Sequence, residues 1–177
     1  MKKTGKTAAL ALTMSMAVTA MPFGVSAEET DKTVVRINME SEPDNLDPWL
    51  SAASDTEAVF HNVFEGLVLF DETGALIPGL AESWDISDDG LEYTFHLRQG
   101  VKFHNGNDFT AEDVAYTFHR MLTVEGGVNT EFIDQIKGAD ELLAGETDTL
   151  EGVEVVDDYT IKVTLKEPFA GFLASIS

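Results

Sequence analysis

Histidine and carboxylate side chains are the groups of this sequence that could most readily do chemistry. It contains four histidines, His61, His96, His104 and His119, and 32 acidic residues. Two histidines four residues apart on a helix could hold one metal ion, but no pair has that spacing and no HExxH motif occurs. Because acidic residues are abundant throughout, any one pair is weak evidence for acid/base catalysis. We therefore predict no metal site and no cofactor.

Motifs for nucleophilic or nucleotide chemistry are also missing from the sequence. It contains no GxSxG serine motif, no GxGxxG dinucleotide motif and no phosphate-binding loop. By elimination, the residues favour a binding protein over an enzyme.

Three hairpins and two helices would have to position any binding residues. Alternating apolar residues and intervening turns predict strands at 67–70 with 75–77, 84–86 with 93–97, and 153–156 with 160–165. Apolar residues at helical spacing predict a helix from Thr110, as N-cap, to Leu122. Shorter helical segments are expected at 130–135 and 139–144.

The region before these hairpins is predicted to be partly irregular. Residues 33–39 alternate like a strand, whereas Pro43 and Pro48 predict an extended, irregular connection over 42–49. Ser54 with Glu57 three residues later resembles a capping box, which predicts a helix from Ser54 to about Phe64.

The first 27 residues are typical of a secretory signal peptide. Three lysines precede an apolar stretch of small residues, and Val25-Ser26-Ala27 suits signal peptidase, so we expect the mature chain to begin at Glu28. The chain has no cysteine, which excludes disulfides and a lipid-bearing cysteine. We expect a periplasmic or secreted protein without a lipid anchor.

The charge of the chain restricts its partners. The formal net charge is −21, and such a surface repels phosphate backbones and anionic lipids. We therefore expect no binding to nucleic acid or to a membrane surface.

Residues 78–121, PGLAESWDISDDGLEYTFHLRQGVKFHNGNDFTAEDVAYTFHRM, resemble the signature region of family 5 extracellular solute-binding proteins, which are peptide- and nickel-binding receptors of ABC importers. The segments SEPDNLDP, VFEGLVLFDETGAL and VEVVDDYTIKVTLKEPFAGFL are also similar to that family, and they occur in the same order.

The resemblance implies an α/β fold of the periplasmic binding protein type (type II), with two lobes and an extra subdomain. Members are several hundred residues longer, so we expect only the N-terminal part of the fold here. Residues 28–64 would begin the first ligand-binding lobe, and residues 65–177 would form the extra α/β subdomain, incomplete at its C-terminus.

The resemblance also implies which residues approach the ligand. In peptide-binding relatives the segment after LDP reaches the cleft. In this chain that segment comprises Ser51, Ala52, Ala53 and Ser54. The loop after the long helix approaches it too, near Asn129 and Thr130. Some oligopeptide binders carry an acid for the peptide's amino end at the position where this chain has Ala52, so the resemblance does not extend to that contact.

The function implied is capture of di- or oligopeptides by a monomeric receptor that delivers them to an ABC permease in the membrane, with no enzymatic step. Alternatives are the same receptor role for nickel chelate, glutathione, haem or oligosaccharide, a secreted hydrolase, or a fragment with no activity of its own.

Overall fold

The structure is a computed structural model that describes residues 36–39 and 41–177. The expected signal peptide, residues 1–27, lies outside the described residues, as do residues 33–35 of the strand expected at 33–39. Residues 36–39 of that strand are described and form no regular structure, so the prediction is wrong there. Alternation alone does not make a strand, because its backbone groups need a neighbouring strand to pair with.

An antiparallel four-stranded sheet carries most of the core. Its order is β3 (Ala81–Ile86), β4 (Glu92–Leu97), β6 (Thr160–Thr164) and β5 (Val153–Asp157). The second and third predicted hairpins are confirmed, and pairing of β4 with β6 joins them into one sheet, with Phe95 opposite Ile161. Alternate residues of β4 point into the core, since Tyr93, Phe95 and Leu97 are all buried.

The first predicted hairpin forms a separate two-stranded sheet. It consists of β1 (Val68–Phe70) and β2 (Leu76–Pro78). The carboxylate of Asp71 accepts hydrogen bonds from Thr73 and Ala75, and Gly74 has a φ of +80°. The turn residues therefore set the hairpin locally, as an aspartate followed by a glycine predicts.

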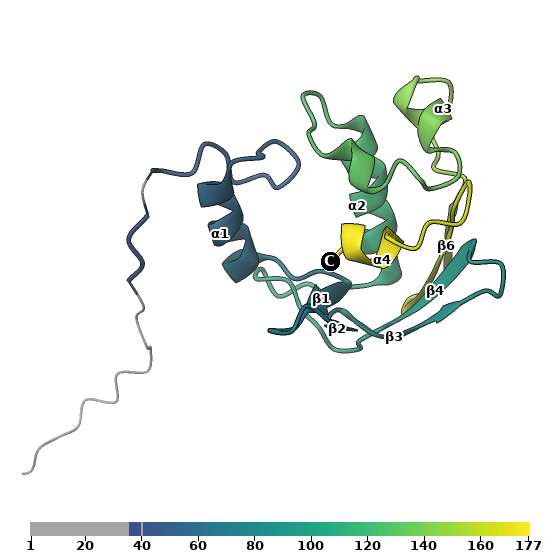
Figure 1. The fold of residues 1–177 in the computed structure, drawn as a ribbon, viewed down its shortest axis with the longest axis horizontal. Coiled ribbons are helices and arrows are strands. Elements are labelled where there is room, and N and C mark those ends of the chain that lie inside the picture. The colour runs from purple at the N-terminus through teal and green to yellow at the C-terminus, as the bar shows by residue number, and fades with distance from the viewer. Residues whose placement is uncertain (1–35, 40) are drawn as a thin grey trace, which may run out of the picture. The chain divides into compact units, whose positions relative to one another are not determined.

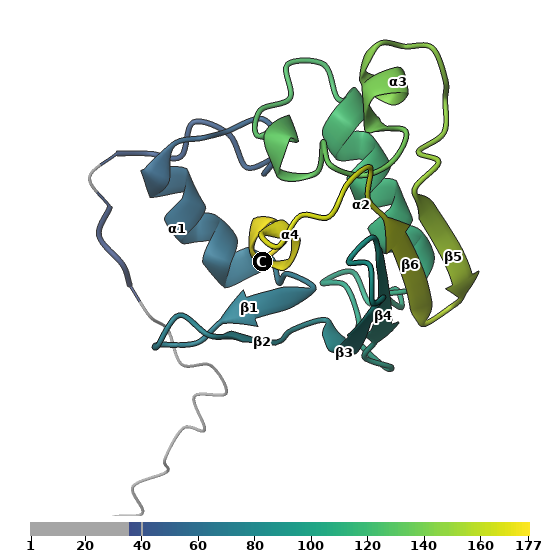
Figure 2. The same cartoon turned by 45° about the vertical axis from the view of Figure 1, so that its right-hand side comes forward.

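Helix α2 (Ala111–Thr123) packs on the four-stranded sheet (Figures 1 and 2). Thr110 is its N-cap, as the sequence indicated, and the carboxylate of Asp113 accepts the Thr110 N–H at 2.8 Å. One face of the helix is buried through Ala111, Val114, Phe118, Met121 and Leu122. This face fixes the rotation of α2, so Tyr116 and Arg120 are directed away from the sheet core.

Helix α1 (Ser54–Val63) forms where it was predicted, but its cap differs. The N-cap is Ala53, and no side chain caps the helix, so the expected Ser54–Glu57 capping box is wrong. Ser54 lies inside the first turn, where its side chain cannot reach the backbone N–H groups that a cap bonds. The one buried residue of α1 is Thr56, whereas Phe64 just after the helix is 51% exposed.

Three short helices complete the described residues. They are the 3₁₀ helix η1 (Thr130–Phe132), α3 (Ala139–Leu143) and α4 (Phe172–Ser175). Ile133, Ile136, Leu142 and Phe172 join the core that also contains Phe95 and Ile161. Among the helices of residues 36–39 and 41–177, none is both long and apolar enough for a membrane crossing.

Gly152 is expected to tolerate no side chain. A Cβ at this position would lie 2.5 Å from the Thr164 carbonyl oxygen and 2.8 Å from the Lys137 nitrogen, both of which are backbone atoms. Gly152→Ala should therefore lower the free energy of unfolding by about 1–3 kcal/mol, because the strand must shift. Urea unfolding followed by circular dichroism would measure the loss.

Gly74→Asn is the control for that substitution. Gly74 has open space around it, and asparagine accepts its positive φ, so the expected loss is no more than about 0.5 kcal/mol. Equal losses in the two variants would contradict the steric explanation.

Candidate functional site

Residues 44–53, here called the anchor loop, are held at their start by one carboxylate. The Oδ1 of Asp44 accepts hydrogen bonds from the Ser51 hydroxyl at 2.6 Å and the Thr56 hydroxyl at 2.8 Å. Thr56 is fully buried and Ser51 is 4% exposed. Two hydrogen bonds lower the pKa of Asp44 below its usual value, because they stabilise the ionised form. The bond from Ser51 has the largest effect, and the bond from Thr56 has the next largest. The carboxylate thus joins both ends of the loop to the first turn of α1.

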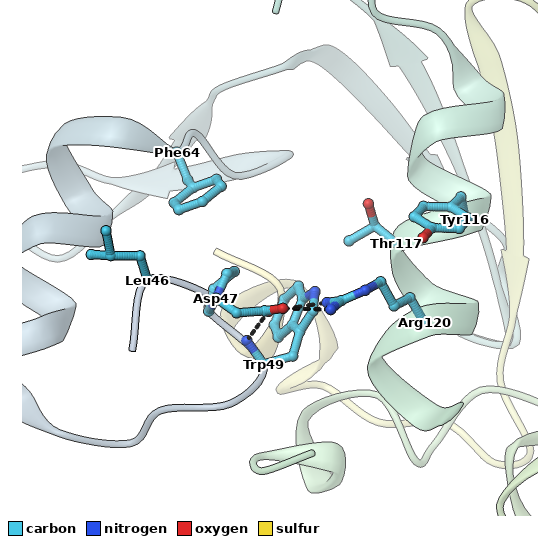
Figure 3. Close-up of a pocket in the computed structure, with 8 residues that line it drawn as sticks. Leu46, Asp47, Trp49, Phe64, Tyr116, Thr117 and Arg120 are labelled. Carbon is cyan, nitrogen blue, oxygen red and sulfur yellow. Dashed lines mark hydrogen bonds and ion pairs between the residues drawn. The ribbon is translucent and has the colours of Figure 1, made fainter. Parts of the chain in front are cut away.

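A second carboxylate joins the middle of the anchor loop to α2. Both terminal guanidinium nitrogens of Arg120, Nη1 and Nη2, donate to the carboxylate of Asp47, with Nη1 at 3.0 Å from Oδ1 (Figure 3). Asp47 Oδ1 also accepts the N–H of Trp49 at 3.1 Å. The side chain of Arg120 is 28% exposed and that of Asp47 is 25% exposed. The hydrogen bonds with Arg120 lower the pKa of Asp47, and those with Asp47 raise the pKa of Arg120.

A backbone hydrogen bond brings the loop after α2 to the anchor loop. The N–H of Val128 donates to the Trp49 carbonyl at 2.8 Å. The next residue, Asn129, has a φ of 63° and is the one non-glycine residue with positive φ in the described part of the chain. Asparagine tolerates this left-handed conformation, which turns the chain into η1.

A shallow hollow of about 370 Å³ lies between the anchor loop and α2 (Figure 3). It combines an apolar surface with one ion pair and two hydroxyls. The lining residues are Leu46, Asp47, Pro48, Trp49, Phe64, Tyr116, Thr117 and Arg120.

The structure places the first predicted ligand-binding segment at the end of the anchor loop. Ser51 is buried, and its hydroxyl is engaged internally, since it donates to Asp44 and accepts the Ala53 N–H at 3.2 Å. Ala52 and Ser54 are exposed, whereas Ala53 is half-buried and precedes α1. Their contact with a ligand stays a prediction.

The second predicted segment is connected to the first through backbone. Asn129 and Thr130 are half-buried and directly follow Val128, which bonds to Trp49 of the anchor loop. The structure therefore joins the loops that carry the two predicted segments, although these lie more than seventy residues apart in the sequence.

Sequence reasoning missed the Asp47–Arg120 ion pair. Near the C-terminus of a helix a cation is favoured by the helix dipole, which accounts for Arg120 without any distant partner. The two residues are separated by 73 positions, and no local spacing relates them. Comparison of many related sequences, in which paired positions change together, is the signal that could have identified it.

The histidines do not gather into a metal site. His96 pairs with Asp85 across β3 and β4 at 2.8 Å, and His119 Nε2 lies 3.1 Å from the Asp148 carbonyl oxygen. Within residues 36–39 and 41–177, no three histidine, cysteine or acidic side chains are close enough to hold a metal ion.

The chain belongs to the bacterial extracellular solute-binding proteins, family 5, whose middle-region model matches residues 75–177. The match covers the β2–β3 connection, the four-stranded sheet, α2 and the C-terminal helices. The resemblance seen in the sequence is thereby confirmed, and so is the fold class.

Individual relatives match over most of this chain. Di/tripeptide-binding protein 1 of Pseudomonas aeruginosa is 36% identical over 146 residues, covering 78% of this chain and 27% of that protein. Heme-binding protein A of Haemophilus influenzae is 44% identical over 123 residues, covering 64% of this chain and 22% of that protein. The crystal structure of Haemophilus influenzae OppA in complex with RPPGFSPFR matches with a TM-score of 0.71 and 32% identity, over 76% of this chain and 27% of that one. The chain thus spans about a quarter of the length of these proteins.

Asp47→Asn should make the free energy of unfolding depend less on pH in the acidic range. In the folded state Arg120 lowers the pKa of Asp47, so the stabilisation is complete above the unfolded value near 3.8 and is lost as pH falls through the folded pKa. At neutral pH the substitution should cost about 1–3 kcal/mol, and the difference from wild type should shrink at low pH. Urea unfolding at a series of pH values would measure it.

The exposed Asp88 in the β3–β4 turn provides the control for this experiment. Asp88→Asn should change stability little at any pH. A wild-type to Asp47→Asn difference that stays constant down to about pH 2 would contradict the role of the ionised pair.

Thr56→Val should weaken the attachment of the anchor loop to α1. The substitution keeps the side-chain shape but removes the hydroxyl that donates a hydrogen bond to the Asp44 carboxylate. The midpoint of thermal unfolding should therefore fall by about 3–8 °C. In the matched control Thr73→Val, the hydroxyl lost also donates to an aspartate, Asp71 at 2.7 Å, but it is exposed. A control loss as large as that of Thr56→Val would show that burial of the Thr56 hydroxyl is irrelevant.

Proposed function

We propose that this chain is part of the extracytoplasmic substrate-binding component of an ABC importer, and that its ligand is a di- or oligopeptide. The observation that carries the proposal is the likeness, at 32% identity, to OppA in complex with RPPGFSPFR. The relative named as a di/tripeptide-binding protein supports the same ligand class. No bond is made or broken in this role.

The anchor loop has properties that suit peptide capture. It is irregular backbone held by side chains rather than by a strand ladder, and Ala52 and Ala53 at its end carry no large side chain. Such a segment can offer main-chain groups to the main chain of a peptide, which any peptide sequence shares. We propose Ser51, Ala52, Ala53, Ser54, Asn129 and Thr130 as the residues nearest the ligand, with Ser51 acting through its backbone because its hydroxyl is engaged.

The division of the chain follows the same proposal. Residues 28–64 would belong to the first ligand-binding lobe, and residues 65–177 would form the extra α/β subdomain. In support, both sheets and α2, α3 and α4 lie after Glu65, whereas α1 and the anchor loop precede it. Export by the signal peptide, a monomeric state and a membrane permease as partner complete the proposal.

Haem is the second candidate ligand, because one relative is named as a heme-binding protein. Haem requires an apolar surface and a side chain that ligates iron. The hollow offers Trp49 and Phe64 as apolar surface, and Tyr116, which is 66% exposed, is of a residue type that ligates haem iron in some proteins.

Calorimetry would decide between these ligands. The complete product of the gene that encodes this chain would be titrated with di- to pentapeptides, with RPPGFSPFR and with haemin. Saturable one-to-one binding of peptides is the expected result. Binding of haemin alone would replace the peptide proposal with the haem alternative, and turnover of a titrated peptide would indicate a hydrolase instead.

A further inference from the structure

The anchor loop has three attachments to three different elements. Asp44 joins it to Thr56 of α1, Asp47 joins it to Arg120 of α2, and the Trp49 carbonyl joins it to Val128 in the loop after α2. Of these, the Asp47–Arg120 pair is at the centre of the loop and connects it to the helix that packs on the sheet.

This ion pair differs from the others in the described residues. It has the lowest exposure on both sides, at 28% and 25%, whereas the partners of Lys102–Asp108 are 55% and 64% exposed. Partial burial reduces screening by solvent and salt, so the pair is stronger than an exposed one. Its two parallel hydrogen bonds also fix the orientation of the carboxylate, which one bond from a lysine would not do.

Such a fixed orientation matters because the loop has no strand ladder to order it. Ordering a residue costs about 1–2 kcal/mol in backbone entropy, and a loop left free would have to be ordered when ligand binds. Asp47 accepts the Trp49 N–H, and the Trp49 carbonyl accepts the Val128 N–H, so hydrogen bonds connect the ion pair to Trp49 and Val128, which shortly precede the two predicted ligand segments in the sequence.

We propose that the Asp47–Arg120 ion pair is a positioning element of the ligand site. It orders the anchor loop and the residues after Val128 before ligand arrives, and so increases affinity for peptide without contacting the peptide. The inference rests on the proposed function, since it names residues that would prepare the same site.

The test compares ligand affinity with local order and overall stability. In the complete gene product, Asp47→Asn and Arg120→Gln should each weaken binding of a tripeptide about tenfold, as expected if only about a tenth of molecules keep the loop in place. The double variant should bind no more weakly than the single variants, because each one already removes the pair. Arg120→Lys, which keeps the charge but loses the two-pronged geometry, should fall between wild type and Arg120→Gln. In all of them the Val128 amide should exchange hydrogen faster.

Lys162→Gln is the matched control. Lys162 on β6 is 31% exposed and pairs with Glu154 at 2.8 Å, away from the anchor loop. Its loss should lower the unfolding midpoint while leaving both peptide affinity and Val128 exchange at wild-type values.

Two results would overturn the inference. The first is wild-type affinity in Asp47→Asn and Arg120→Gln, which would leave the pair a purely structural role. The second is unchanged Val128 exchange, which would show that the pair does not order the loop. If the wild-type protein binds no peptide, the proposed function itself fails, and the exchange measurement still judges the ordering of the loop independently.

Discussion

Pairing of β4 with β6 is the interaction on which the rest of the structure depends. It joins two hairpins that are more than fifty residues apart in sequence, and its register places Tyr93 opposite Val163 and Phe95 opposite Ile161. These side chains are all buried, and α2 covers the core that they form (Figure 2). Because the buried face of α2 fixes its rotation, Arg120 is directed toward the anchor loop. The position of the candidate site thus follows from a strand pairing that contains none of its residues.

The anchor loop and α1 are held in a different way from the sheet. The sheet and α2 bury large apolar side chains, whereas the one buried residue of α1 is Thr56, which bonds to Asp44. A ten-residue helix has little stability of its own in water, so these polar contacts contribute a larger share of the stability of α1. Such hydrogen bonds and ion pairs contribute less to the free energy of unfolding than a packed core does, and they depend on the protonation state of the carboxylates. This part of the molecule should therefore open locally at a lower free energy than the sheet.

The sequence predicted local elements well and their assembly poorly. All three hairpins and the Thr110 cap depend on residues within a few positions of one another, and each was confirmed. The strand expected at 33–39 was wrong over 36–39, because a strand needs a neighbouring strand to pair with. The Ser54 cap was wrong because the helix begins one residue earlier, with Ala53 as its N-cap. The Asp47–Arg120 pair and the Trp49–Val128 bond join distant segments, so no local pattern could indicate them. Resemblance to a family, in contrast, placed candidate residues in two loops that the structure joins.

The two carboxylates of the anchor loop are stabilised by different means. Asp47 is neutralised by Arg120, but Asp44 accepts its bonds from two neutral hydroxyls and a backbone N–H. Both have lowered pKa values, so both are ionised at neutral pH. In the part of the chain that the structure describes, no cationic side chain pairs directly with Asp44, so within the screening length of about 8 Å its charge gives the neighbouring residues of the anchor loop a negative potential. Arg120 therefore also reduces repulsion within the anchor loop: without it, the like charges of Asp44 and Asp47, three residues apart in the sequence, would repel each other.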